Sequence, residues 1–221
     1  MEIRGLLFDM SGVLYDDSAW NRWLLQLLRR MGLHTNYDAF RVLCDHELGS
    51  AEGGDYWAEL KRFLSSVGLS QAQIDEVEAA GFARWQSLQL QIRPFPGVIR
   101  TLTLLSHLGM PKGIVAHSQG GGTRLRNQLR EMGLDGQFQT VESFRTNGDI
   151  QSAFQTAWEQ MGLNPGYGGY VANHTSALRQ AQPHCGRLIA FNTKDRDPAH
   201  HRLQRFQELI DFARSSDRMV G

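Results

Sequence analysis

The chain has 221 residues, 41% of them hydrophobic, so it is long enough to bury a core of its own. Lys and Arg total 23 and Asp and Glu total 23, a balance that argues against the basic footprint of a nucleic-acid-binding protein or a polybasic membrane-surface protein. No apolar run approaches the length of a membrane span, and Cys44 and Cys185 lack metal-site spacing. We therefore expect a cytoplasmic protein with reduced thiols and no membrane partner.

The first predicted element is a buried strand over Ile3–Phe8 that ends at Asp9. A short apolar run followed by an acidic residue is typical of a parallel strand whose carboxyl end carries a functional group. From about residue 17 to residue 93 the apolar spacing becomes helical, as in Trp20, Leu24, Leu27, Met31 and in Tyr56, Leu60, Phe63, Val67. Ser70 to Gln73 has the spacing of a capping box. This block predicts a separate domain made of helices.

Two prolines and a glycine in the stretch 93–98 mark a loop, after which strands and helices alternate. Strands are predicted over 113–116, 138–141, 169–172 and 188–191. Helices are predicted over 98–108, 123–132 and 150–161, around Leu178, and in a last segment that carries Leu203, Phe206, Leu209 and Ala213 and opens with a solvated His200-His201 pair. The alternation predicts an α/β fold, a Rossmann-like parallel sheet with helices on both faces.

Several polar residues fall at the ends of predicted strands. Asp9, His117 and Asn173 hold such positions, and ligands of parallel sheets bind beyond the carboxyl ends of the strands. We expect these side chains to converge there, together with Ser118 and His174. Each has a structural alternative: Asp9 as the cap of the next turn, and His117 as a strand-end histidine.

A run of glycines precedes the predicted helix at 123–132. Gly120, Gly121 and Gly122 can present backbone N–H groups to an anion, and Arg124 lies close by in the sequence. The structural alternative is a flexible hinge. The pattern makes this segment a candidate ligand-binding loop.

The order of these features resembles the haloacid dehalogenase-like (HAD-like) hydrolases over almost the whole chain. The stretch FDMSGVLYD, with Asp9 and Gly12, is similar to the first motif of that superfamily, and PFPGVIRTLTLLSHLGMPKGIVAHS is similar to its return segment and second motif. The resemblance implies a HAD-like core over residues 1–15 and 94–221 and an inserted helical cap over residues 16–93. It points to the capped phosphatase or phosphonatase branch.

The catalytic positions of the family are only partly present. The nucleophilic aspartate matches Asp9, but the second aspartate, the general acid and base, matches Ser11. A serine cannot protonate a leaving group near neutral pH, and losing a positioned acid costs about 10²–10⁴ in rate. The motif-two hydroxyl matches Ala116, next to His117. We therefore expect Asp9 to be a vestigial nucleophile.

The charged partners of the family's chemistry are also replaced. The stretch FRTNGDIQSAF has no third-motif lysine, and Arg145 is its nearest cation. The fourth motif offers Asn173 and Ala177 in place of the Mg²⁺ carboxylates, so Asp9 and Asn173 would hold the metal weakly or not at all. We expect no cofactor, with Mg²⁺ bound at most weakly.

Three functions remain open from the sequence. The first is a degenerate HAD-like protein, a pseudo-hydrolase, that binds a small anion or a protein partner. The second is an active hydrolase with phosphonatase-, dehalogenase- or phosphatase-like chemistry, using Asp9 as nucleophile and His117 as base. The third is a nucleic-acid-binding regulator that uses Arg-bearing helices, which the net charge of zero does not support.

Overall fold

The computed structural model describes residues 3–16, 18–36, 39–40, 56–89, 92–118, 120–145, 147–193 and 198–217. The chain divides into two compact units, one of residues Met1–Asp16 with Arg93–Gly221 and one of residues Asp17–Ile92. Each unit has its own hydrophobic core.

The first unit is built on one parallel sheet. Its strands are β1 (Gly5–Phe8), β2 (Lys112–His117), β3 (Thr140–Phe144), β4 (Gly168–Ala172), β5 (Arg187–Phe191) and β6 (His201–Leu203). They lie in the order β3-β2-β1-β4-β5-β6, and each neighbouring pair is parallel. Because all carboxyl ends then lie at one edge, residues that follow different strands come together there.

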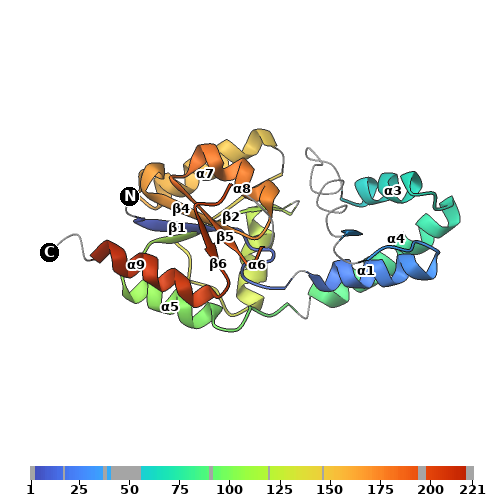
Figure 1. Ribbon diagram of the computed structural model, residues 1–221, viewed down its shortest axis with the longest axis horizontal. Helices are drawn as coiled ribbons and strands as arrows, with labels where there is room; N and C mark the ends of the chain where they lie inside the picture. Colours follow the sequence, from blue (N-terminus) through green and yellow to red (C-terminus); the bar gives the residue numbers. More distant parts are fainter. Residues whose placement is uncertain are drawn as a thin grey trace. The chain divides into compact units, whose positions relative to one another are not determined.

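Helices cover both faces of this sheet (Figure 1). They are α5 (Val98–His107), α6 (Gly121–Glu131), α7 (Asn147–Gln160), α8 (Thr175–Ala181) and α9 (Leu209–Asp217), with single 3-10 turns η1 (Pro165–Tyr167), η2 (Gln182–His184) and η3 (Phe206–Glu208). Figure 1 shows α7 and α8 on one face and α5 and α9 on the other. The predicted α/β Rossmann-like architecture is therefore confirmed.

Apolar packing on the α7 and α8 face explains why these helices dock on the sheet. Trp158 and Phe154 of α7 are buried against Tyr170 of β4, and the Phe154 and Tyr170 rings meet edge to face at 5.1 Å. The indole N–H of Trp158 donates to the carbonyl oxygen of His184 at 2.8 Å. Burying an aromatic or leucine-sized side chain contributes about 1.5–3 kcal/mol, so this face is a principal source of stability.

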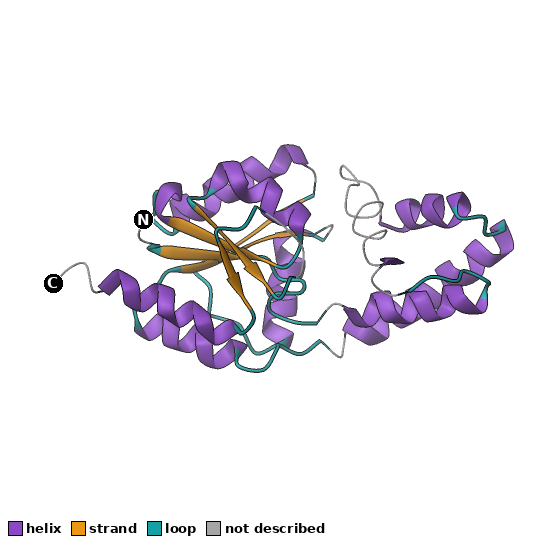
Figure 2. Cartoon of the chain, in the orientation of Figure 1, coloured by secondary structure: helices purple, strands orange, loops and turns teal. Residues whose placement is uncertain are grey.

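The second unit contains, among its described residues, helices and connecting loops (Figure 2). The helices α1 (Ser18–Arg30), α3 (Tyr56–Ser66) and α4 (Gln71–Gln89) share one core, whose buried members are Trp20, Leu24, Leu25, Leu28, Phe40, Leu60, Phe63, Leu64, Ile74 and Val77. The capping box predicted at the start of α4 is present. Gln73 N donates to Ser70 Oγ at 3.4 Å, and Ser70 N donates to Gln73 Oε1 at 2.9 Å.

The predicted last helix is wrong over its first half. His201–Leu203 form β6, which pairs with β5, and the helix α9 begins at Leu209 after the turn η3. Leu203 and Phe206 are buried, as the helical spacing required, but so few apolar positions fit a strand followed by a turn equally well. His201 therefore starts an edge strand, His200 directly precedes it, and the pair does not open a helix.

A second strand is displaced from its predicted range of 138–141. Phe138 precedes β3, which covers Thr140–Phe144, and the centroid of its ring lies 6.0 Å from that of the Phe8 ring.

The two cysteines differ in what the structure describes. Cys185 is a free thiol, and burial raises its pKa to about 12, whereas Cys44 lies outside the described residues. Within the part of the chain that the structure describes, no helix is long and apolar enough to cross a membrane.

Candidate ligand-binding site

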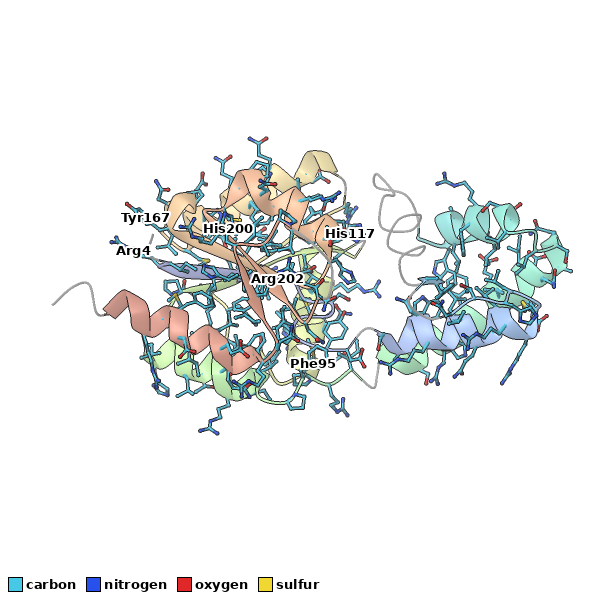
Figure 3. All side chains as sticks on the ribbon, in the orientation of Figure 1. Arg4, Phe95, His117, Tyr167, His200 and Arg202 are labelled. Carbon is cyan, nitrogen blue, oxygen red and sulfur yellow. The ribbon has the colours of Figure 1, made fainter. Side chains whose placement is uncertain are left out.

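Four predicted site residues come to the carboxyl edge of the sheet. Asp9 follows β1, His117 ends β2, Arg145 follows β3 and Asn173 follows β4. The register pairs Phe8 with both Ile114 and Val171, so the strand ends are neighbours in the sheet. Figure 3 shows His117 at this edge, with Arg4 and Tyr167 at the opposite end of the sheet.

Asp9 is half-buried and is held by the backbone of its neighbours. Its N–H donates to the carbonyl oxygen of Val171 at 2.9 Å, and its Oδ1 accepts from Met10 N at 2.7 Å. The phenol of Tyr170, on β4, is buried and senses the charge of this carboxylate. The Tyr170 hydroxyl donates to the carbonyl oxygen of Val115 at 3.1 Å, and burial and then the charge of Asp9 raise its pKa. The carboxylate thus stands beside a buried, neutral hydroxyl.

The loop after Asp9 brings two hydroxyl groups together. Ser11 Oγ lies 3.4 Å from the hydroxyl oxygen of Tyr15, and Gly12 N donates to the Tyr15 carbonyl oxygen at 3.1 Å. Gly12 has φ 68°, a left-handed conformation that favours glycine. At the place where the family has its second carboxylate, this chain therefore has a serine beside a phenol. Tyr15 was missed because the resemblance assigns no catalytic role to its position in the first-motif stretch.

Asn173, at the fourth-motif position, forms a hydrogen bond with the end of β5. Its Nδ2 donates to the carbonyl oxygen of Phe191 at 3.0 Å. A Cβ at Gly12 would lie 2.9 Å from Asn173 Cγ, so the side chain also packs closely on the first loop. The amide is therefore used structurally, and the sequence carried no signal for Phe191 as its partner.

His117 ends β2 beside the end of β3. Its ring meets that of Phe144 edge to face at 5.8 Å. Burial lowers the pKa of His117, and a hydrogen bond with the backbone of Arg145 raises it by a smaller amount. Because the net shift is downward, the imidazole is neutral near pH 7 and can accept a proton.

A tight turn links β2 to α6. Ser118 is buried, its N–H donates to the Phe144 carbonyl oxygen at 3.1 Å, and its Oγ donates to the Gly121 carbonyl oxygen at 3.3 Å. Gly121 N closes the turn on the Ser118 carbonyl oxygen at 3.1 Å, with φ 67°. These bonds give the glycine segment a defined shape, and α6 begins at Gly121.

Two arginines lie against this turn. A Cβ at Gly120 would lie 2.6 Å from Arg124 Cδ, so the Arg124 stem packs on that glycine. A Cβ at Gly121 would lie 3.7 Å from Arg145 Nη2. Within the described residues, neither guanidinium has a hydrogen-bond or ion-pair partner. Arg124 and Arg145, which the sequence analysis assigned to different motifs, therefore lie against the same turn.

His174 is less directly involved with this turn. It occupies the position before α8, where its carbonyl oxygen accepts from Leu178 N at 3.1 Å. Its side chain is half-buried and does not cap the helix. The structure therefore places His174 next to Asn173, on the β4 side of the carboxyl edge.

The residues at this edge fit Mg²⁺ poorly. Asp9 contributes a carboxylate, but the amide of Asn173 is turned toward the Phe191 carbonyl and supplies no negative charge. Mg²⁺ in proteins favours charged oxygen ligands in a near-octahedral arrangement. In the described part of the chain, no three His, Cys, Asp or Glu side chains lie together as a metal site would require.

Comparison with solved structures identifies the fold. A HAD family hydrolase from Deinococcus radiodurans, with bound phosphate and sodium, superposes with a TM-score of 0.70 at 17% identity, covering 97% of this chain and 96% of that one. An L-2-haloacid dehalogenase gives 0.68 at 19%, covering 97% and 100%. A subfamily IA HAD-superfamily hydrolase from Geobacter sulfurreducens gives 0.66 at 19%, covering 96% of each chain. The chain has the haloacid dehalogenase-like fold.

The HAD-like fold was the one expected from the motifs around Asp9 and the loop at 93–98. No protein-family model matches the sequence, and no curated protein matches it. At sequence identities below 25%, the structural similarity is evidence for the fold alone.

Proposed function

We propose that this HAD-like chain is a degenerate hydrolase that acts by binding a small anionic ligand at the carboxyl edge of its sheet. The observation that carries the proposal is the pair of guanidiniums of Arg124 and Arg145 against the Gly120-Gly121 turn, neither of which has a partner among the described residues. Guanidinium groups bind phosphate and carboxylate through paired N–H donors, and they remain charged at any physiological pH. His117, which hydrogen-bonds with the Arg145 backbone and is neutral near pH 7, offers a polar group at the same edge without adding charge.

The groups around Asp9 favour binding over hydrolysis. Ser11 and Tyr15 present hydroxyls where an acid would be needed, and the Asn173 amide is bonded to Phe191. Losing a positioned general acid costs about 10²–10⁴ in rate, and losing one charge-stabilising donor costs about 10²–10³. Such losses do not simply multiply, but two of them leave little turnover.

A second candidate is a hydrolase of altered chemistry, and the lowered pKa of His117 favours it. In that reaction an Asp9 carboxylate oxygen attacks the carbon or phosphorus of the substrate, and the leaving group departs with the bonding electrons. His117 then takes a proton from the water that cleaves the covalent intermediate, an ester after attack on carbon or an acyl phosphate after attack on phosphorus. The neutral imidazole fits this role.

Calorimetric titration with inorganic phosphate tests the binding proposal. Phosphate is the ion named with the Deinococcus radiodurans structure of the same fold. We expect Arg124→Gln and Arg145→Gln each to weaken binding by about 10-fold, the loss of one charge-assisted contact. Arg130→Gln is the matched control, because Arg130 lies on the same helix and is exposed. Absent binding, or binding that neither variant changes, would refute the proposal.

A substrate screen separates the two candidates. Aryl phosphate, phosphonate and haloacid substrates are incubated with the wild type and with Asp9→Asn. Turnover by the wild type that Asp9→Asn abolishes would support the hydrolase and count against the degenerate reading. Phosphate binding without such turnover would support the binding function.

A further inference from the structure

The edge strand β6 begins with an unusual hydrogen bond. Leu188 N, in the neighbouring strand β5, donates to Nδ1 of the His200 side chain at 3.0 Å. The His200 N–H returns a bond to the Leu188 carbonyl oxygen at 2.9 Å. Along a regular strand both bonds would be made by backbone groups, so an imidazole here replaces a carbonyl of the ladder.

This bond requires one protonation state of His200. Nδ1 can accept from Leu188 N only when it carries no proton, which places the single proton of the neutral ring on Nε2. A second proton turns Nδ1 into a donor that faces another donor. Leu188 is fully buried, and a buried N–H without an acceptor is costly. Histidine is the side chain that gains this proton between pH 5 and 8.

Among the described residues of β5 and β6 that flank His200, the charged side chains are positive. Arg187 precedes Leu188 on β5, and His201 and Arg202 follow on β6. Arg179 on α8, His184 on η2, and Asp211 and Arg214 on α9 are among the titratable or charged groups of these helical elements. Burial, then Arg187 and His200, lower the pKa of His201, so the two imidazoles are electrostatically coupled. A second charged imidazole therefore adds repulsion as well as losing the bond.

We propose that His200 makes β6 a pH-sensitive edge strand, which pairs with β5 when the imidazole is neutral and loosens when it is doubly protonated. Figure 3 shows His200 and Arg202 on this part of the sheet. The strand is short, from His201 to Leu203, so the bond at its start is a large share of its pairing. At its other end the Leu203 carbonyl oxygen accepts from Asn192 N at 2.8 Å.

Loosening of β6 reaches the end of β5 that borders the candidate site. Asn192 directly follows Phe191, whose carbonyl oxygen holds the Asn173 amide. Acidification would therefore free the segment on which Asn173 depends. This device is independent of whether the site binds an anion.

Amide hydrogen exchange by NMR tests the proposal at Leu188, with rates divided by the intrinsic rate at each pH. We expect protection of this amide in the wild type to fall at least about 10-fold between pH 7.5 and pH 5.0. His200→Asn puts a non-titrating oxygen at the place of Nδ1, so its protection should stay flat. His201→Asn, the neighbouring control, should keep the wild-type fall.

Two outcomes would overturn the proposal. One is equal pH dependence in the wild type and His200→Asn, and the other is a wild-type amide whose protection does not change. If His200→Asn does not fold, the wild type still decides the matter. The Leu188 amide shift must then titrate with the same midpoint as the His200 ring carbons, and different midpoints would refute the link.

Discussion

The side-chain amide of Asn173 donates to the carbonyl oxygen of Phe191 at 3.0 Å, and this bond defines what the fourth-motif position does in this chain. A carboxylate at the same place would face a carbonyl oxygen across the same gap. The bond therefore binds the β4 end to the β5 end, in a location where HAD-like enzymes are expected to hold a metal. The Asn173 side chain therefore has a structural role at this edge of the sheet.

We predict that Asn173→Asp destabilises the protein by about 1–3 kcal/mol, because the Phe191 carbonyl loses its donor and meets a negative charge. Urea unfolding measures the change. Asn164→Asp is the matched control, since Asn164 Oδ1 accepts from Gly166 N at 2.8 Å and an aspartate keeps that acceptor. We expect the control to change stability by less than about 0.5 kcal/mol. Equal losses in both variants would contradict the assigned role.

Mg²⁺ binding follows from the same contact. Wild type has the Asp9 carboxylate but an amide at Asn173, so calorimetry should detect no saturable Mg²⁺ binding tighter than about millimolar. Asn173→Asp supplies the second charge, so added Mg²⁺ should stabilise this variant more than the wild type. Micromolar affinity in the wild type that Asp9→Asn removes would show the prediction to be wrong.

Gly12→Ala tests the close approach of the first loop to Asn173. The new Cβ would lie 2.9 Å from Asn173 Cγ, at a residue with φ 68°. Gly133→Ala has the same strain, with φ 70°, but no atom within 4 Å of its Cβ. We expect Gly133→Ala to cost about 1–2 kcal/mol, and Gly12→Ala to cost at least about 1 kcal/mol more. Thermal unfolding of both variants measures the difference, and equal melting temperatures would rule out the clash.

Gly81→Ala reports on the helical unit. Alanine in place of glycine inside a helix normally stabilises it by about 1 kcal/mol. Here a Cβ would lie 2.7 Å from Trp57 Cη2, and the Trp57 ring already meets Trp20 and Phe82 at 5.7 and 4.3 Å. Overpacking costs about 1–3 kcal/mol, so we expect net destabilisation.

The Trp57→Leu background provides the control for Gly81→Ala. With the indole gone, the same alanine should stabilise the protein, which reverses the sign of its effect on the melting temperature. A Gly81→Ala variant that is stabilising in both backgrounds would mean that the indole moves aside without cost.

Stability should fall as pH falls below about 6.5, the ordinary pKa of histidine. Burial lowers the pKa of His117, His184 and His201 in the folded protein. The unfolded chain therefore binds more protons in this window, and the contribution present above pH 6.5 is lost on acidification. Urea midpoints at pH 7.5 and 5.5 measure the loss, and His184→Gln should reduce it. A midpoint that rises on acidification would contradict the assigned directions.

Local sequence patterns predicted the elements that are long or strongly patterned. The apolar stripe with Ile150, Phe154 and Trp158 became α7, and Ser70 with Gln73 capped α4. The helix predicted over Leu203 and Phe206 was wrong, because three or four apolar residues fit a short strand and a turn as well as a helix. Pairing with β5 decided between them.

The sequence by itself predicted that Asp9, His117 and Asn173 come to one edge, since parallel strands separated by helices leave their carboxyl ends together. That Ser11 and Asn173 stand where carboxylates are expected is what the resemblance to HAD-like hydrolases implies, and it remains a prediction. Only the tertiary structure decided what these residues touch. Tyr15 beside Ser11, Phe191 under Asn173, and Arg124 with Arg145 on one glycine turn are contacts between side chains or loops whose directions depend on packing. A linear pattern encodes which face a residue occupies, but partners from other strands and loops are set by the register and close packing of the folded chain.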